Sequence, residues 1–121
     1  MQIFESGEMY LETILILAQQ KDGVHAIDVA NRMSYSKPSV SRALKLLAEG
    51  GFITVNSMSH IQLTEQGRRR AEMIFERHRV LSKVFSDLGV PEDIADTDAC
   101  KIEHIISPET FAVIKEKLYK K

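Results

Sequence analysis

The sequence has few of the features that mark secreted or membrane proteins. Its 121 residues include one cysteine, three prolines and no tryptophan. A single cysteine cannot form an intrachain disulfide, which favours a reducing compartment. The apolar runs, such as ILIL at 14–17, are far shorter than the ~20 residues that span a bilayer. The N-terminus also lacks the basic start and long apolar run of a signal peptide, so we expect a cytoplasmic protein with no membrane partner.

Neither positive nor negative charge predominates, because 16 basic and 17 acidic residues give a net charge of −1. The distribution is uneven, however. Residues 31–79 carry nine Lys or Arg and four acids, a net of +5, whereas residues 1–30 and 80–121 have nets of −4 and −2. A basic middle between two acidic ends indicates a local anion-binding surface. Ordinary solvated charges would give the same totals, so charge alone leaves both interpretations open.

Apolar spacing and turn residues predict three helices in the first 50 residues. The first spans 8–20 and ends at a DG turn, and the second spans 25–33. The third spans 36–50, with Ser36 as its N-cap and Pro38 in its first turn. The residues predicted to face inward are Leu11, Ile14, Leu15 and Ala18, then Ile27, Val29, Ala30 and Met33, then Val40, Ala43, Leu44 and Leu47.

A short hairpin follows these helices. Residues 52–55 and 61–64 are predicted to form two strands around a polar turn. Two helices joined by a tight turn and followed by a hairpin are typical of a winged helix-turn-helix. We therefore expect a mainly α fold whose N-terminal domain, at 1–71, is a winged helix-turn-helix with a small β-hairpin wing.

The rest of the chain predicts an α-helical domain at 72–121. A long helix over 64–90, opened by Thr64, is followed by a turn or short helix at 91–95 and a helix over 96–107. A last helix begins at a Ser107 cap. The long helix is predicted to bury Met73, Ile74, Val80, Leu81, Val84 and Phe85, and the 96–107 helix to have Asp96 or Thr97 as its cap. A dimer contact is expected around Val84, Phe85, Ile105, Phe111 and Ile114.

In a helix-turn-helix, residues near the start of the second of its two helices reach base edges in the major groove. In this chain that helix is the one over 36–50. The candidate DNA-binding residues are therefore Lys37, Pro38, Ser39, Ser41, Arg42 and Lys45, with Lys45 on phosphate. Among the arginines outside that helix, four are further candidates, which either contact the DNA backbone or form a solvated face: Arg68, Arg69, Arg70 and Arg77. A winged helix that binds protein is the alternative interpretation. Because no catalytic triad and no Gly-rich phosphate loop is recognisable, we expect no enzyme.

The stretch DACKIEHI, at 98–105, combines a thiol, a carboxylate and an imidazole. On a helix, Cys100, Glu103 and His104 share one face, because residues three and four apart lie on the same side. This combination indicates a metal site, although a lone cysteine is commonly a small buried hydrophobe.

Three further residues are candidate metal ligands. Glu12 lies within the apolar stretch MYLETILIL, where an unpaired carboxylate is costly to bury, and Met9 shares its face. His78 lies mid-helix beside apolar neighbours. Each also has an ordinary structural explanation, with Met9 as core filler, Glu12 as a surface acid and His78 as a packing residue.

The chain also resembles a known family over nearly its whole length. The segments EMYLETILIL, SKPSVSRALKLLAEGGFI, IQLTEQGRRRA, ERHRVLSKVF, LGV and ACKIEHIIS look like successive landmarks of the diphtheria toxin repressor family, which includes iron-dependent repressors and the manganese transport regulator. The resemblance implies a homodimeric repressor that binds palindromic double-stranded operator DNA when loaded with a divalent metal, and so controls metal-ion homeostasis genes. The metal residues that it implies are Met9, Glu12, His78, Cys100, Glu103 and His104.

The implied ligands bear on which metal is bound. In length the chain resembles the manganese branch, yet that branch has carboxylates where this chain has Met9 and Cys100. A thioether and a thiolate are softer ligands, which favour Fe²⁺ over Mn²⁺. We therefore predict Fe²⁺ as the co-repressor, Mn²⁺ as the alternative, and binding of Co²⁺, Ni²⁺ or Zn²⁺ in vitro.

The resemblance also implies how the ligands are grouped. We expect one well-formed site of Met9, Cys100, Glu103 and His104, and a weaker second site of Glu12 and His78 with a shared carboxylate. In the iron branch, His78 belongs to an ancillary site whose other positions fall on Ser82, a poor ligand, and Asp96, a possible one. A winged-helix regulator that senses an organic ligand or oxidation at Cys100 is the rival hypothesis.

Overall fold

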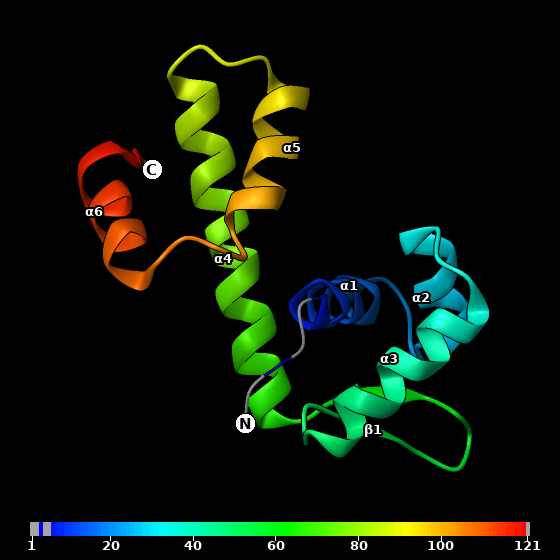
Figure 1. Cartoon of the computed structure of the whole chain (residues 1–121). Helices are drawn as coiled ribbons and strands as arrows, with labels where there is room; N and C mark the ends of the chain where they lie inside the picture. The colour runs from blue at the N-terminus through cyan, green and yellow to red at the C-terminus, as the bar shows by residue number, and fades with distance from the viewer. Residues whose placement is uncertain (1–2, 4–5, 121) are drawn as a thin grey trace. The chain divides into compact units, whose positions relative to one another are not determined.

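The computed structural model describes residue 3 and residues 6–120. The chain divides into two compact units, Met1–Glu72 and Met73–Lys121. Figure 1 follows the mainly helical chain through both units. Within the described residues, none of the helices combines the length and the apolar character that crossing a bilayer requires.

The first unit begins with three helices, α1 (Gly7–Gln20), α2 (Ala26–Met33) and α3 (Lys37–Glu49). Ser36 caps α3, because its Oγ accepts a hydrogen bond from the amide of Ser39 at 3.3 Å. Most of the predicted inward face is confirmed, but Ala18 is exposed and Ile27 is 42% exposed. The core of this unit includes Leu11, Ile14, Val29, Val40, Leu47, Phe52 and Ile53.

A two-stranded antiparallel hairpin of β1 (Ile53–Val55) and β2 (Ile61–Leu63) follows α3. Its register pairs Ile53 with Leu63 and Val55 with Ile61. The loop between α1 and α2 adds a single bridge, in which the amide of Ile61 donates to the carbonyl of Val24 at 2.7 Å. The predicted helix-turn-helix with a hairpin wing is therefore confirmed, with one extra pairing that the sequence pattern did not predict.

The start of α4 (Glu65–Asp87) is fastened to the end of α3 and the hairpin. Thr64 donates its hydroxyl to the carbonyl of Gly51 at 2.6 Å and accepts from the amide of Gly67 at 3.1 Å. A Cβ on Gly67 would overlap the carbonyl oxygen of Phe52. The first turn of α4 therefore packs on the backbone at the strand entrance.

The second unit consists of the rest of α4 with α5 (Glu92–Ile102) and α6 (Pro108–Leu118). Helix α5 runs back along the second half of α4 (Figure 1). The Oγ of Ser107 caps α6 by accepting from the amide of Thr110 at 3.1 Å, as predicted. The core cluster of this unit is Val80, Leu81, Val84, Ala99 and Phe111.

Three predictions about the second unit are wrong. One continuous helix, α5, replaces the predicted turn or short helix at 91–95 and the separate helix over 96–107, because the acidic Glu92 and Asp93 favour a helix start directly after Pro91. Asp96 and Thr97 therefore lie inside the helix, where the hydroxyl of Thr97 bonds the carbonyl four residues back. Met73 is 39% exposed and does not belong to the buried face.

The expected dimer contact also needs correction. Val84 and Phe111 belong to the core of their own unit, and Phe85 and Ile114 pack against that core. Of the five predicted contact residues, Ile105 is the well-exposed one, with 81% of its surface accessible. Other large exposed apolar side chains of this unit are Leu88, Ile94, Val113 and Leu118.

Candidate functional site

Helix α3 presents the predicted DNA-binding residues away from its buried face. Its buried stripe is Val40, Ala43, Leu44 and Leu47. On the remaining surface Ser39 is half-buried, and the exposed members of the predicted set are Lys37, Pro38, Ser41, Arg42 and Lys45. A helix face of this kind, with three cations and two hydroxyls, has the chemistry to contact phosphates and base edges.

The first turn of α3 is preorganised by its own hydroxyl groups. Ser36 donates its hydroxyl to the Oγ of Ser39 at 2.9 Å, and Arg42 donates Nη2 to the same oxygen at 3.4 Å. No acidic residue lies in this turn. The positive end of the helix dipole and the cations Lys37 and Arg42 therefore favour an anion at the start of α3.

The four further arginine candidates, Arg68, Arg69, Arg70 and Arg77, have different environments. Arg70 pairs with Glu8, with 3.0 Å between Nη1 and Oε2, and Arg69 pairs with Glu65 one turn earlier on α4. Arg68 is exposed, and within the described part of the chain it has no ion pair. Arg77 is only 7% exposed, so neither predicted role, a DNA backbone contact or a solvated face, applies to it.

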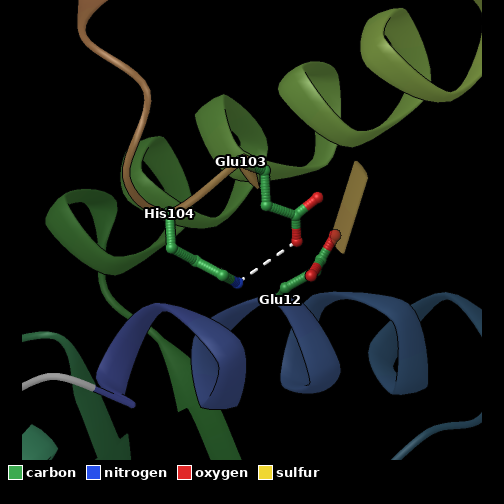
Figure 2. Close-up of side chains that lie close together, drawn as sticks. All are labelled: Glu12, Glu103 and His104. Atoms are coloured by element: carbon green, nitrogen blue, oxygen red, sulfur yellow. Dashed lines mark ion pairs between the residues drawn. The ribbon is translucent and has the colours of Figure 1, made fainter. Parts of the chain in front are cut away.

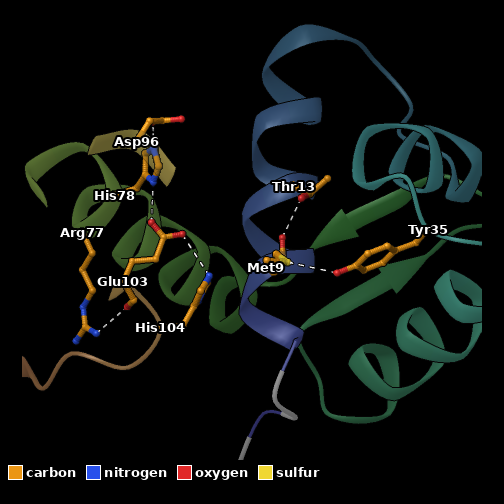
Figure 3. A network of polar contacts seen from close by, with 8 residues as sticks. All are labelled: Met9, Thr13, Tyr35, Arg77, His78, Asp96, Glu103 and His104. Carbon is orange, nitrogen blue, oxygen red and sulfur yellow. Dashed lines mark hydrogen bonds and ion pairs between the residues drawn. The ribbon is translucent and has the colours of Figure 1, made fainter. Parts of the chain in front are cut away.

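A fully buried carboxylate lies between two imidazoles in the second unit (Figure 3). Glu103, the C-cap residue of α5, has no exposed surface. Its Oε2 lies 2.8 Å from Nδ1 of His78 on α4, and its Oε1 lies 3.2 Å from Nε2 of His104. The other ring nitrogen of His78, Nε2, lies 2.6 Å from Oδ1 of Asp96. We call His78, Asp96, Glu103 and His104 the carboxylate–histidine cluster.

The cluster holds His78 in its charged form. Hydrogen bonding to Glu103 raises the pKa of His78 to about 9, with Asp96 acting in the same direction and burial opposing both. The imidazolium then donates from both ring nitrogens, one to each carboxylate. A buried carboxylate is costly unless a positive charge compensates it, and the His78 imidazolium supplies such a charge.

The chemistry of the cluster fits a divalent metal. Imidazole nitrogens and carboxylate oxygens are common ligands of Fe²⁺, Mn²⁺, Co²⁺, Ni²⁺ and Zn²⁺. A divalent cation would also supply the positive charge that Glu103 requires. Cys100 lies half-buried in the last turn of α5, and Asp96, Cys100 and Glu103 follow one another at helical spacing of four and three residues.

The first unit contains the other two predicted ligands. Met9 and Glu12 are half-buried on α1, three residues apart. The hydroxyl of Tyr35 donates to Sδ of Met9 at 3.8 Å, and the hydroxyl of Thr13 donates to the carbonyl of Met9 at 2.9 Å. Figure 2 labels Glu12 on α1 together with the Glu103–His104 pair of the second unit.

The structure thus brings together three of the predicted ligands, His78, Glu103 and His104. Asp96 joins them, although sequence reasoning considered it as a metal ligand only through the resemblance. Sequence reasoning also missed the environment of Arg77. A signal for it was available, because Arg77 lies three residues after Ile74 and four before Leu81, within the apolar stripe of α4.

Two family models match the chain in succession. The model described as the iron dependent repressor N-terminal DNA binding domain matches residues 2–61. The model described as the iron dependent repressor metal binding and dimerisation domain matches residues 64–120. Together they cover nearly every residue, in the order that the fold presents.

Individual relatives agree with these models. The iron-dependent repressor IdeR of Mycobacterium tuberculosis is 29% identical over 109 residues, which cover 89% of this chain and 47% of that protein. The transcriptional regulator MntR of Salmonella typhimurium is 36% identical over 102 residues, which cover 84% of this chain and 65% of that protein. The chain therefore spans about half the length of the first of these relatives and about two thirds of the second.

Solved structures share the fold. A manganese-dependent transcriptional repressor in complex with manganese matches with a TM-score of 0.83 and 31% identity, over 93% of this chain and 52% of that one. IdeR of T. acidophilum matches with a TM-score of 0.80 and 22% identity, over 97% of this chain and 55% of that one, a likeness of fold alone. The chain belongs to the iron-dependent repressor family, the diphtheria toxin repressor family whose landmarks run through its sequence.

Proposed function

We propose that this chain is a cytoplasmic, metal-dependent transcriptional repressor that binds palindromic operator DNA as a homodimer when loaded with a divalent metal. It is a regulator and not an enzyme. The observation that carries the proposal is the buried Glu103 carboxylate between His78 and His104, in a segment that matches a metal binding and dimerisation domain. The DNA-binding domain is 1–71, and the metal-binding and dimerisation domain is 72–121.

The proposed metal ligands are those that the sequence predicts, Met9, Glu12, His78, Cys100, Glu103 and His104. Within the carboxylate–histidine cluster, Glu103 offers oxygens toward both imidazoles and is held without exposure to water. Asp96 orients His78 through its second ring nitrogen, in the way that outer carboxylates orient ligating histidines. When bound, the metal supplies positive charge, and it favours the DNA-binding state by differential affinity for the two states.

Fe²⁺ is the proposed physiological metal. The support is the soft character of the Met9 thioether and the Cys100 thiolate, which carboxylate-only sites for Mn²⁺ lack. A relative named for iron is 29% identical to this chain, and a solved structure named for manganese is 31% identical. Mn²⁺ is therefore the alternative that the experiment must separate, and Co²⁺, Ni²⁺ or Zn²⁺ bind in vitro.

DNA is contacted by the exposed face of α3, through Lys37, Pro38, Ser39, Ser41, Arg42 and Lys45. The cations and hydroxyls of the first α3 turn support this proposal. A second copy of the chain packs on exposed apolar side chains of the second unit, Ile105 among them.

The test is an anaerobic titration of chelator-stripped protein with Fe²⁺ and with Mn²⁺, read as affinity and metals per chain. The same samples are then used to select duplexes from a random DNA library and to measure binding by fluorescence anisotropy. We expect tighter Fe²⁺ binding, and DNA binding that requires metal. Cys100→Ala weakens the preference for Fe²⁺, and His104→Ala abolishes metal-dependent DNA binding while the chain stays folded by circular dichroism.

Two results would contradict the proposal at different levels. Preferential binding of Mn²⁺ would replace the iron assignment with the manganese one and leave the regulator intact. The rival hypothesis of a thiol sensor would be favoured if chelator did not affect DNA binding and mild oxidation abolished it in wild type. Cys100→Ser would then keep its DNA binding after the same oxidation.

A further inference from the structure

Arg77 is a cation placed inside the apolar face of a helix. It lies on α4 between Ile74 and Leu81, which are both fully buried, and it is itself 7% exposed. Burying a guanidinium is costly unless its hydrogen-bond donors find partners and its charge is compensated. An apolar side chain would fill this position without the free-energy cost of desolvating a charge. The presence of a buried arginine here therefore requires an explanation.

The partners of Arg77 are backbone carbonyls just beyond the end of α5. Its Nη1 donates to the carbonyl of Ile106 at 2.9 Å and to the carbonyl of Glu103 at 3.2 Å. Helix α5 ends at Ile102, so these carbonyls point from the turn after the helix, where the helix dipole is negative. A single guanidinium nitrogen therefore bridges both ends of the turn 103–106.

The same guanidinium also contacts α6. Its central carbon lies 5.6 Å from the centroid of the Phe111 ring, a cation–π distance. Phe111 belongs to the core cluster of the second unit. Arg77 is thus anchored by the core on one side and holds the turn on the other, and Figure 3 shows it reaching toward the backbone of Glu103.

We propose that Arg77 is a positioning residue for metal binding: it fixes the turn 103–106, so that the side chains of Glu103 and His104 are held in the arrangement that ligates a metal. The inference rests on the proposed function. Arg77 does not ligate the metal itself. It affects metal affinity because the two ligands Glu103 and His104 lie on the turn whose backbone carbonyls Arg77 binds. Outer contacts that orient ligands contribute about 10–100-fold to metal affinity in other metal sites.

The test compares Arg77→Met with the wild-type chain, using Co²⁺ alone as the probe. Methionine keeps the apolar stem of the side chain and removes the donors and the charge. Affinity, metals per chain and the visible d–d absorption of Co²⁺ are measured, and the urea midpoint of the metal-free protein is measured alongside. Arg79→Met is the matched control, because Arg79 is exposed two residues further along α4 and stacks on Phe75.

We expect Arg77→Met to bind Co²⁺ at least about tenfold more weakly, with an altered d–d spectrum, while Arg79→Met stays within about twofold of wild type. Arg77→Lys falls between the two, because an ammonium donates to carbonyls but lacks the planar stack on Phe111. A lower urea midpoint with wild-type affinity and spectrum would assign Arg77 a purely structural role and overturn the inference.

Two further outcomes are also decisive. If Arg77→Met does not fold by circular dichroism, the titration is made with Arg77→Gln, which removes the charge and shortens the side chain, and wild-type affinity and spectrum in that variant overturn the inference. If the wild-type chain itself binds no Co²⁺, Fe²⁺ or Mn²⁺, the proposed function fails, and the inference fails with it. Binding by wild type that Arg77→Met retains unchanged contradicts the inference alone.

Discussion

Gly67, in the first turn of α4, packs directly against the backbone of Phe52, so that a Cβ at position 67 would overlap the Phe52 carbonyl oxygen. Alanine is intrinsically better than glycine in a helix by about 1 kcal/mol. The contact opposes this preference, because a backbone carbonyl at a strand entrance cannot rotate away as a side chain can.

The first prediction follows from that contact. We expect Gly67→Ala to lower the free energy of unfolding by roughly 1–3 kcal/mol, the usual cost of overpacking, despite the gain in helix propensity. Urea denaturation followed by circular dichroism measures it. Gln66→Ala, at the exposed neighbouring position, is the control and is expected to stay within about 0.5 kcal/mol of wild type. A stabilised Gly67→Ala would show that propensity outweighs the contact.

The second prediction concerns pH and the start of α2. The carboxylate of Asp28 accepts from the amide of His25 at 2.8 Å and from Nζ of Lys21 at 2.9 Å. The bond from the His25 amide, and then Lys21, lower the pKa of Asp28 below its usual 3.8. Because the pKa of Asp28 is lower in the folded chain than in the unfolded chain, its carboxylate stabilises the folded chain at pH values above the unfolded-state pKa. This stabilisation is lost as the pH falls through the folded-state pKa.

Asp28→Ala should therefore destabilise the chain by roughly 0.5–1.5 kcal/mol at pH 7, the net value of one intramolecular hydrogen bond. The difference from wild type should shrink as the pH is lowered below about 4. Urea midpoints measured at several pH values test this. Lys21→Ala removes only a largely exposed ion pair and should cost at most about 1 kcal/mol. A difference that stays constant down to pH 3 would contradict the assignment.

The third prediction concerns metal removal. A ligand that binds only the folded chain at 100 times its dissociation constant stabilises it by about 2.7 kcal/mol. Wild-type protein saturated with Fe²⁺ or Mn²⁺ should therefore unfold at higher urea than chelator-stripped protein. Glu103→Gln should remove this difference, because the variant lacks the buried anion. Equal shifts in wild type and Glu103→Gln would mean that the metal binds elsewhere.

The fourth prediction separates the roles of the α3 cations. Arg42→Ala should cost about 1–3 kcal/mol of binding to the selected operator and relax its sequence preference, if Arg42 reads a base. Lys45→Ala should weaken binding to all sequences and reduce the slope of log affinity against log salt by about 1. Lys83→Ala is the control, because Lys83 lies on the second half of α4, pairs with Asp87 and is not a candidate DNA contact. Wild-type salt dependence in Lys45→Ala would remove it from the phosphate contacts.

The fifth prediction tests the link between Met9 and the residue before the α3 cap. Because Tyr35 donates to the sulfur of Met9, ligation by that sulfur competes with the hydrogen bond. Tyr35→Phe should therefore increase Fe²⁺ affinity by a few-fold, since the weak bond no longer holds the thioether. Met9→Leu should lose affinity, and in that background Tyr35→Phe should have no further effect. Additive effects of the two substitutions would show that Tyr35 affects metal affinity independently of the Met9 sulfur.

The sequence predicted the features that depend on local chemistry. The caps Ser36, Thr64 and Ser107 accept the hydrogen bonds expected of them, because an N-cap needs only a hydroxyl and the next few amides. The apolar stripe of α3 was predicted without error, because its period is that of a helix. These features need no knowledge of the rest of the fold.

Features that depend on distant residues were not predictable in this way. The burial of Arg77 requires the carbonyls of Glu103 and Ile106, which lie 26 and 29 residues away. Ile27 fits the helical stripe predicted from the sequence, yet it is 42% exposed. The meeting of His78 with both Asp96 and Glu103 depends on how α5 returns along α4, which no local pattern encodes.

The double role of Thr64 has a consequence for where the chain tolerates insertions. One hydroxyl closes the hairpin onto Gly51 and begins α4 at Gly67, so the junction between β2 and α4 contains no spare residue. The opposite end of the hairpin is different, because the exposed turn around Met58 is organised mainly by the Asn56 side chain. A fluorescent label or a short peptide tag belongs at that tip, whereas even a single added residue at position 64 would separate the two contacts of Thr64 and disturb the junction between the hairpin and α4.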